Sequence, residues 1–217
     1  MAEITRKQQE QITEQGNPSR PQGEAGAEML ARMNESHAEV TEWALSYFDW
    51  RGDEQVLDIG CGGGATLQRM SAHIGAEGHL TGLDYSEVSV AESRAFNAAE
   101  IESGHMDVLT GSVENLPFAA DSFNKITTVE SFYFWPDPAE NLKEVRRVLK
   151  AGGTFLLIAD IYNHEGLSQK TKENIAKYEM FNPTLTEYQQ LFEQAGFVEV
   201  QIHTQTGEDW VCVEGRK

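Results

Sequence analysis

The sequence predicts an α/β protein built on a doubly wound, seven-stranded and mostly parallel sheet that closes with an antiparallel hairpin. Short apolar runs alternate with helical patterns from residue 55 onward, which is typical of parallel strands joined by right-handed crossovers. Glycines cluster directly after the first run, where such sheets often bind a nucleotide. Two last apolar runs flank a turn at Thr206, Gly207 and Glu208, which favours a hairpin.

The expected strands are apolar enough to be covered on both faces of the sheet. They cover residues 55–60, 79–83, 106–110, 123–129, 154–159, 197–204 and 208–213. The helical patterns between them lie near residues 65–74, 87–102, 138–149 and 184–196. We therefore expect one domain over residues 51–217.

Signals at element boundaries support this interpretation. Asp137 is a plausible N-cap for the helix near 138–149, with Pro138 at its first position, and Gly152-Gly153 is expected to end that helix. The last helix is expected to begin at Thr184 or Thr186 and to end at Gly196. Residues 161–183 interrupt the alternation, either as a cap over a site or as an ordinary loop and helix.

The chain before residue 51 divides into two segments. Residues 1–26 are polar and rich in Gln, Glu, Gly and Pro, which predicts a flexible segment. Apolar residues at helical spacing over residues 27–50 predict one or two helices.

The formal net charge of −18 at pH 7 disfavours nucleic-acid and anionic-membrane partners, both of which need a basic surface. No apolar run is long enough to span a bilayer, and the N-terminus lacks an apolar signal core, so we expect a cytoplasmic protein. Cys61 and Cys212 have no metal or redox spacing and are expected to be reduced and structural. No metal site is predicted.

The segment from Val56 to Gly64 carries the strongest functional signal. A buried-strand run ends near Asp58, and Gly60, Gly62 and Gly64 follow. Glycines allow the backbone to approach a ligand closely, and the N–H groups of a following helix point at that ligand. The spacing fits both the dinucleotide fingerprint and the variant that binds S-adenosylmethionine (SAM). Asp84, after the second strand, would bind ribose hydroxyls in either case.

Later blocks separate these alternatives. They are residues 111–118 after the third strand, 121–123 before the fourth, 149–154 before the fifth, and 195–197 before the hairpin. From Val56 onward this ordered set resembles the class I SAM-dependent methyltransferases, in the small-molecule branch with a methyltransferase type 11 core. The resemblance implies a Rossmann-like fold, SAM as methyl donor with S-adenosylhomocysteine as product, and N-terminal helices at residues 27–50 that cover the cofactor pocket.

The resemblance also implies a cofactor site. Asp58 and the glycine turn would hold the amino-acid end of SAM, Asp84 the ribose, Ser112 the adenine edge, and Glu130 the methionine end. Ser112 stands where the family usually has an acidic residue, so it would accept a hydrogen bond as a neutral partner. The full implied set is Asp58, Gly60, Cys61, Gly62, Asp84, Tyr85, Ser86, Ser112, Val113, Glu114 and Glu130.

The methyl acceptor is expected among side chains near the open face of the cofactor. Aromatic residues directly after the fourth strand would pack a flat substrate or face a cation, or else belong to the core. His37 is the candidate proton acceptor, and no other catalytic residue is assigned. The candidate substrate residues are Asn34, His37, Tyr133, Trp135 and Tyr178.

The sequence thus predicts a class I SAM-dependent methyltransferase that acts on a small molecule by in-line transfer. A NAD(P)-binding oxidoreductase remains an alternative because the glycine turn fits both cofactors. A non-catalytic, regulatory SAM-binding protein is the second alternative.

Overall fold

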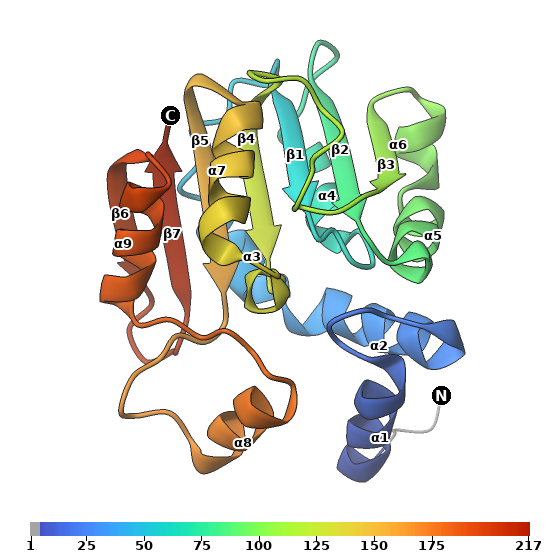
Figure 1. Cartoon of the computed structure of the whole chain (residues 1–217). Coiled ribbons are helices and arrows are strands. Elements are labelled where there is room, and N and C mark those ends of the chain that lie inside the picture. Colours follow the sequence, from blue (N-terminus) through green and yellow to red (C-terminus); the bar gives the residue numbers. More distant parts are fainter. Residues whose placement is uncertain (1–4) are drawn as a thin grey trace.

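The structure, a computed structural model, describes residues 5–217 and contains one seven-stranded sheet in the order β3-β2-β1-β4-β5-β7-β6 (Figure 1). The strands β1 to β5 pair in parallel, and β7 is antiparallel to both β5 and β6. The fold class predicted from the sequence, including the closing hairpin, is therefore confirmed. The strands are β1 Gln55–Ile59, β2 His79–Asp84, β3 Met106–Thr110, β4 Phe123–Val129, β5 Leu149–Ala159, β6 Val198–Thr204 and β7 Val211–Arg216.

Helices cover both faces of the sheet, as a doubly wound fold requires (Figure 1). Leu57 of β1 belongs to a core cluster that includes residues of α7 and α9. Its neighbour Val56 belongs to a second cluster that includes residues of α3 and α4. The helices are α1 Arg6–Gly16, α2 Gly23–Ser36, α3 Ala38–Leu45, α4 Ala65–Ser71, α5 Glu87–Phe96, α6 Ala98–Glu102, α7 Pro138–Val148, α8 Gln169–Lys177 and α9 Leu185–Gln194, with a 3-10 turn at Phe132–Phe134.

The N-terminal region is more regular than its composition predicts. Helix α1 lies inside the segment predicted to be flexible and begins with a capping box between Thr5 and Gln8. It packs against α2, where Arg32 donates to the backbone oxygen of Gln9 at 3.0 Å. Capping and a tertiary hydrogen bond, rather than an apolar stripe, account for this helix. The part of the flexibility prediction that concerns residues 1–4 lies outside the described residues.

Helix α7 has the predicted bounds to within one residue, but Gly152-Gly153 is not its stop signal. Asp137 accepts from the backbone N–H of Glu140, and Pro138 is the first helical residue, as expected. The predicted end at Gly152-Gly153 is wrong, because α7 ends at Val148 and both glycines lie in β5. A Cβ on Gly153 would lie 2.9 Å from the backbone oxygen of Asn124. This glycine is therefore explained by close strand packing rather than by helix termination.

Two further boundaries differ from the prediction. The helical pattern at 87–102 forms two helices, α5 and α6, which meet at Asn97. The amide of Asn97 donates to the backbone oxygens of Gly64 and Ser93, both at 3.0 Å, so it serves the contact with α4 rather than helix continuity. The last strand begins at Val211 and extends to Arg216, beyond the predicted end at residue 213.

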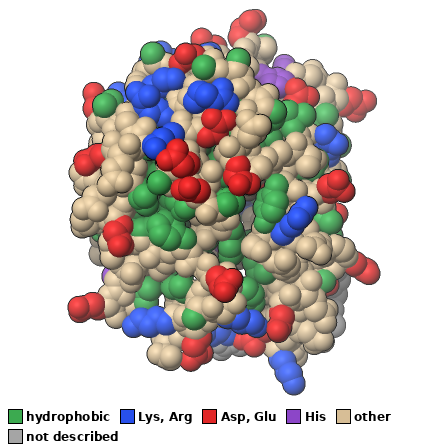
Figure 2. Space-filling model, viewed as in Figure 1, with side chains coloured by type: hydrophobic (Ala, Val, Ile, Leu, Met, Phe, Trp, Pro, Cys, Tyr) green, Lys and Arg blue, Asp and Glu red, His purple; other side chains and the backbone are tan. Residues whose placement is uncertain are grey.

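The insert at residues 161–183 contains α8, and Thr184 then caps α9 through a capping box with Glu187. Helix α8 lies at the same end of the molecule as α1 and α2 (Figure 1). In Figure 2 acidic side chains are scattered over the whole visible face, with basic ones among them. Among residues 5–217, no helix combines the length and the apolar character needed to cross a bilayer.

Candidate functional site

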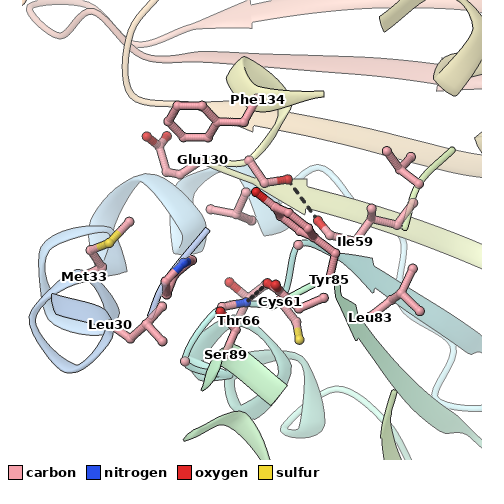
Figure 3. Close-up of a pocket in the computed structure, with 18 of the residues that line it drawn as sticks. Leu30, Met33, Ile59, Cys61, Thr66, Leu83, Tyr85, Ser89, Glu130 and Phe134 are labelled. Carbon is pink, nitrogen blue, oxygen red and sulfur yellow. Dashed lines mark hydrogen bonds between the residues drawn. The ribbon is translucent and has the colours of Figure 1, made fainter. Parts of the chain in front are cut away.

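A cavity of about 220 Å³ lies where the carboxyl ends of β1, β2 and β4 meet α2 (Figure 3). Strand ends of a parallel sheet share one edge, so turns that are distant in sequence converge there. Figure 3 shows Glu130 and Phe134 on the β4 side of this cavity, opposite Met33 and Leu30 of α2. Helix α2 thus covers the site, in the place predicted for the N-terminal helices.

The glycine turn after β1 forms one wall of the cavity. Gly60, Gly62 and Gly64 have φ values of +73°, +51° and +84°, which side chains disfavour. A Cβ on Gly60 would also lie 2.4 Å from Oγ of Ser131. The backbone N–H groups of Gly60 and Cys61 donate to the oxygen of Leu83 at 2.7 and 3.1 Å, which ties the turn to β2.

Asp84, at the end of β2, lines the cavity next to this turn. Its Oδ2 accepts the N–H of Gly62 at 3.0 Å and its Oδ1 accepts the N–H of Ser86 at 2.9 Å. Burial raises the pKa of this carboxyl group above its usual value. Each carboxylate oxygen has a further lone pair, so Asp84 can still accept a hydrogen bond from a ligand.

Residues 18–21 close the cavity over Asp84. Oγ of Ser86 donates to the backbone oxygen of Pro21 at 2.6 Å, and the hydroxyl of Tyr85 donates to the oxygen of Ser19. Tyr85 lines the cavity as predicted. Ser86 does not line it, because its hydroxyl also caps α5 by accepting the N–H of Ser89.

The segment Ser112, Val113 and Glu114 after β3 lines the far end of the cavity. Oγ of Ser112 donates to the carboxylate of Glu114 at 3.1 Å and accepts the backbone N–H of Glu114 at 3.2 Å. Both side chains offer acceptor atoms at this wall.

Asp58 lies outside the cavity, although the resemblance placed it in the cofactor site. Side chains alternate along β1, so Asp58 points away from the side occupied by Ile59. It is 1% exposed, and Oγ1 of Thr127 in β4 donates to its Oδ1 at 2.7 Å. Burial raises its pKa to about 7. In this structure Asp58 joins β1 to β4 beneath the glycine turn.

Side chains rather than backbone form the wall after β4. Glu130 has φ +55°, and its carboxylate accepts the N–H of Asp160 and the hydroxyl of Tyr133. The Tyr133 hydroxyl also lies 3.1 Å from Oδ1 of Asp160. Burial and the neighbouring Asp160 raise the pKa of Glu130 well above its usual range. Tyr133 is buried behind the wall, whereas Phe134 and Trp135 line the cavity.

Asn34 and His37 both line the cavity from the α2 side, as predicted. The amide of Asn34 donates to the backbone oxygen of Gly63 at 3.2 Å, which fastens α2 to the glycine turn. His37, Glu130 and Asp160 offer ligand atoms that lie within 4.8 Å of one another. Burial lowers the pKa of His37, with Arg32 and Arg69 acting in the same direction and Asp160 opposing them.

Four of the predicted site residues, Asp58, Ser86, Tyr133 and Tyr178, do not line the cavity, and several residues in or beside it were not predicted. Tyr178 caps the end of α8 and does not line the cavity. Asp160 follows β5 at the same sheet edge, so the rule about strand ends could have identified it. The remaining missed residues reach the cavity through helix packing, and among them are Leu30, Met33, Thr41, Thr66, Arg69 and Ser89.

Comparison with known proteins identifies the family. Residues 57–157 match a family model described as a methyltransferase domain. The chain is 31% identical over 180 residues to a demethylmenaquinone methyltransferase of Staphylococcus haemolyticus, covering 70% of this chain and 72% of that protein. It is also 31% identical over 148 residues to 2-methyl-6-phytyl-1,4-hydroquinone methyltransferase 1, chloroplastic, of Oryza sativa subsp. japonica, covering 68% of this chain.

The chain spans only 42% of the length of the rice protein and 40% of the length of its spinach counterpart. Among solved structures, a SAM-dependent methyltransferase from Aquifex aeolicus superposes with a TM-score of 0.69 at 18% identity, covering 87% of this chain and 97% of that one. This likeness supports the fold, and the sequence relatives define the family. The chain belongs to the class I SAM-dependent methyltransferases, with a methyltransferase type 11 core.

Proposed function

We propose that this chain binds SAM in the cavity and transfers its methyl group to a small-molecule acceptor. One observation carries the proposal: the glycine turn, Asp84 and the segment 112–114 line a single cavity whose remaining wall holds Glu130 and His37. The first three would bind a nucleoside with an amino-acid tail, and the last two would face the acceptor.

The residues present fit this cofactor. Two of the turn glycines, Gly60 and Gly62, line the cavity, so the backbone there is open to close approach by a ligand. Ser89 also lines the cavity, and its Oγ is buried without a hydrogen-bond partner among the described residues. An unsatisfied buried hydroxyl is costly, and a polar ligand would relieve that cost. When bound, SAM supplies an electrophilic methyl group, and the chain positions the acceptor against it.

A panel of nucleotides tests the proposal against the NAD(P) alternative. SAM and S-adenosylhomocysteine are expected to raise the melting temperature, because a ligand that binds only the folded state stabilises it. NAD and NADP are expected to leave it unchanged. The opposite pattern would refute the proposal.

Asp84→Ala tests the proposed ribose contact. The variant loses a charged acceptor that also orders Gly62, so calorimetry should show S-adenosylhomocysteine binding weaker by about 100-fold, or roughly 3 kcal/mol. Asp107→Ala is the matched control, because Asp107 lies on β3 with its side chain largely exposed. Wild-type affinity in Asp84→Ala would remove the ribose assignment.

The non-catalytic alternative predicts SAM binding without transfer. A panel of phenols, amines, thiols and carboxylic acids, incubated with SAM, should yield S-adenosylhomocysteine for at least one acceptor class. Tight SAM binding with no product from any class would favour a regulatory protein.

A further inference from the structure

We propose that His37 is the base that accepts a proton from the methyl acceptor, and that Asp160 and Glu130 are its positioning residues. The acceptor is accordingly a hydroxyl group on a flat conjugated ring, a phenol or an enol. This inference rests on the proposed function and specifies the acceptor class of the same cavity.

Three separate elements bring these residues together. His37 lies at the junction of α2 and α3, Glu130 follows β4, and Asp160 follows β5. Their nitrogen and oxygen atoms lie within 4.8 Å of one another. Glu130 adopts a left-handed backbone conformation at φ +55°, which a non-glycine residue adopts at an energetic cost. Such strain at a cavity wall is typical of a functional position.

Within this cluster, in the described part of the chain, the two carboxyl groups are held by hydrogen bonds, whereas the imidazole ring of His37 is not. The hydroxyl of Tyr133 donates to Glu130 and approaches Asp160, and the backbone N–H of Asp160 donates to Glu130. By contrast, among residues 5–217 no side chain or backbone group is hydrogen-bonded to the imidazole ring of His37. The ring lines the cavity, so its nitrogens are available to a bound acceptor.

The surroundings of His37 favour its neutral form, which is the form that accepts a proton. Burial, Arg32 of α2 and Arg69 of α4 lower its pKa below the usual value, while Asp160 raises it. Glu130 faces the same group, and burial together with the neighbouring Asp160 raises its pKa well above its usual range. Asp160, the group that raises the pKa of His37, is placed to stabilise the imidazolium once the proton has moved.

The walls beside the cluster are apolar and aromatic. Phe134 lines the cavity from the segment after β4, and Leu30 and Met33 line it from α2 (Figure 3). Trp135 also lines it from the segment after β4. Such walls favour a flat, weakly polar acceptor over a strongly hydrated one. A hydroxyl on this kind of ring is acidic enough for a histidine to ionise, whereas an isolated alkyl alcohol is not.

Proton transfer precedes or accompanies methyl transfer in the proposed reaction. The O–H bond of the acceptor breaks, its proton moves to a ring nitrogen of His37, and the electron pair remains on the oxygen. That pair, acting at the oxygen or through conjugation at a ring carbon, forms the bond to the methyl group. After attack at a ring carbon, the C–H bond of that carbon breaks, its proton goes to water and its electron pair restores the conjugated ring. The S–CH₃ bond breaks with its electrons on sulfur, which leaves S-adenosylhomocysteine. His37 then releases its proton to water.

A spectroscopic probe tests the proton transfer without turnover. 4-Nitrophenol is titrated into the complex with S-adenosylhomocysteine, and its ionisation is followed by visible absorbance. The apparent pKa of the bound phenol should fall by about one unit or more relative to free phenol, a tenfold change in ionisation. His37→Gln should abolish that fall, and His105→Gln should retain it, because His105 is exposed and distant in the fold. An unchanged phenol spectrum in the wild type, or the same fall in His37→Gln, would overturn the proposal.

Asp160→Asn tests the positioning role. Without the carboxylate, the pKa of His37 should fall further, because Asp160 is the group that raises it. Nitrogen-15 NMR of the imidazole measures this directly, and the same variant should shift the acid limb of the probe's ionisation to lower pH. A purely structural role would leave the His37 titration unmoved and would contradict the assignment.

Two controls separate the possible failures. Calorimetry with S-adenosylhomocysteine should give similar affinity for the wild type and His37→Gln; absent binding to both would refute the proposed function rather than this inference. A cluster of His, Glu and Asp can also bind a metal ion, and titration with Mn²⁺ and Zn²⁺ tests this alternative. A rise in melting temperature with either metal that His37→Gln abolishes would replace the base with a metal site.

Discussion

The turns that follow β1 and β4 lie side by side at one edge of the sheet, yet they shape the cavity by different means. After β1, glycines at positive φ expose backbone, and neighbouring side chains leave no room for a Cβ on Gly60. After β4, the side chains of Glu130, Phe134 and Trp135 form the wall. The first turn suits a ligand common to a whole family, whereas the second can vary with the acceptor. In the proposed function, backbone geometry therefore binds the cofactor, and side chains determine which acceptor is used.

Gly60→Ala should break the first of these turns and have the largest effect. A side chain at φ +73° is strained, and its Cβ would lie 2.4 Å from Oγ of Ser131, so the two turns would be forced apart. Unfolding in urea should show a loss of about 3 kcal/mol, and calorimetry should show no measurable binding of S-adenosylhomocysteine.

Gly152→Ala is the control that separates the cost of positive φ from the cost of a steric clash. Gly152 has nearly the same φ, +74°, but a Cβ added there would meet no atom within 4 Å. Its variant should lose only about 1 kcal/mol and keep full ligand affinity. If both alanine variants lost the same amount of unfolding free energy, the close approach of Ser131 to Gly60 would contribute nothing to the effect of Gly60→Ala.

Asp58 joins the two strands that carry these turns and should make stability depend on pH. Its folded pKa of about 7 is raised by burial, whereas the unfolded value is near 3.8. The folded state therefore binds more protons between these values. The contribution is fully present below the unfolded pKa and is lost as the pH rises through the folded pKa, by roughly 4 kcal/mol at most.

Asp58→Asn isolates this effect. The amide oxygen can still accept from Thr127, but the group cannot ionise. Denaturant unfolding of the wild type should therefore lose stability between pH 4 and pH 7 more steeply than unfolding of the variant. Parallel pH profiles would show that Asp58 titrates normally and does not tie β1 to β4 as a protonated acid.

Ser112→Asp changes the wall after β3 and should have the smallest effect of these variants. A carboxylate accepts more strongly than a hydroxyl, so SAM binding should tighten about fivefold, or roughly 1 kcal/mol. Glu114 lies within hydrogen-bonding distance of Ser112 and would repel the new charge, so Glu114→Gln in the same chain should increase the gain. Calorimetric affinity that is unchanged in both variants would place adenine away from this wall.

Local patterns predicted most elements of the fold but only one half of the site. The apolar strand runs, Asp137 with Pro138, and the Gly207 turn each contain their own signal, and the structure agrees with them. Gly152-Gly153 misled the prediction because glycine has two uses, ending helices and admitting close backbone, and only the packed structure distinguishes them.

The same limit applies to the site. The residues of the glycine turn and Asp84 were predictable because motif spacing fixes their place at strand ends. Arg69 was missed because its role depends on which helix packs over which strand end, whereas Asp160 directly follows β5 and the rule about strand ends could have identified it. Asp58 was misplaced because a motif position says nothing about the face of the strand on which the side chain lies.

The fastening of residues 18–21 has a kinetic consequence. This segment lines the cavity and is held by Ser86 and Tyr85 through hydrogen bonds to the backbone oxygens of Pro21 and Ser19. A molecule that fills the cavity beneath it leaves only when these two bonds open. The residence time of the spent cofactor and the susceptibility of the first helices to proteases therefore both depend on how often this segment opens. A contact that keeps the segment closed lengthens the residence time and reduces the susceptibility to proteases.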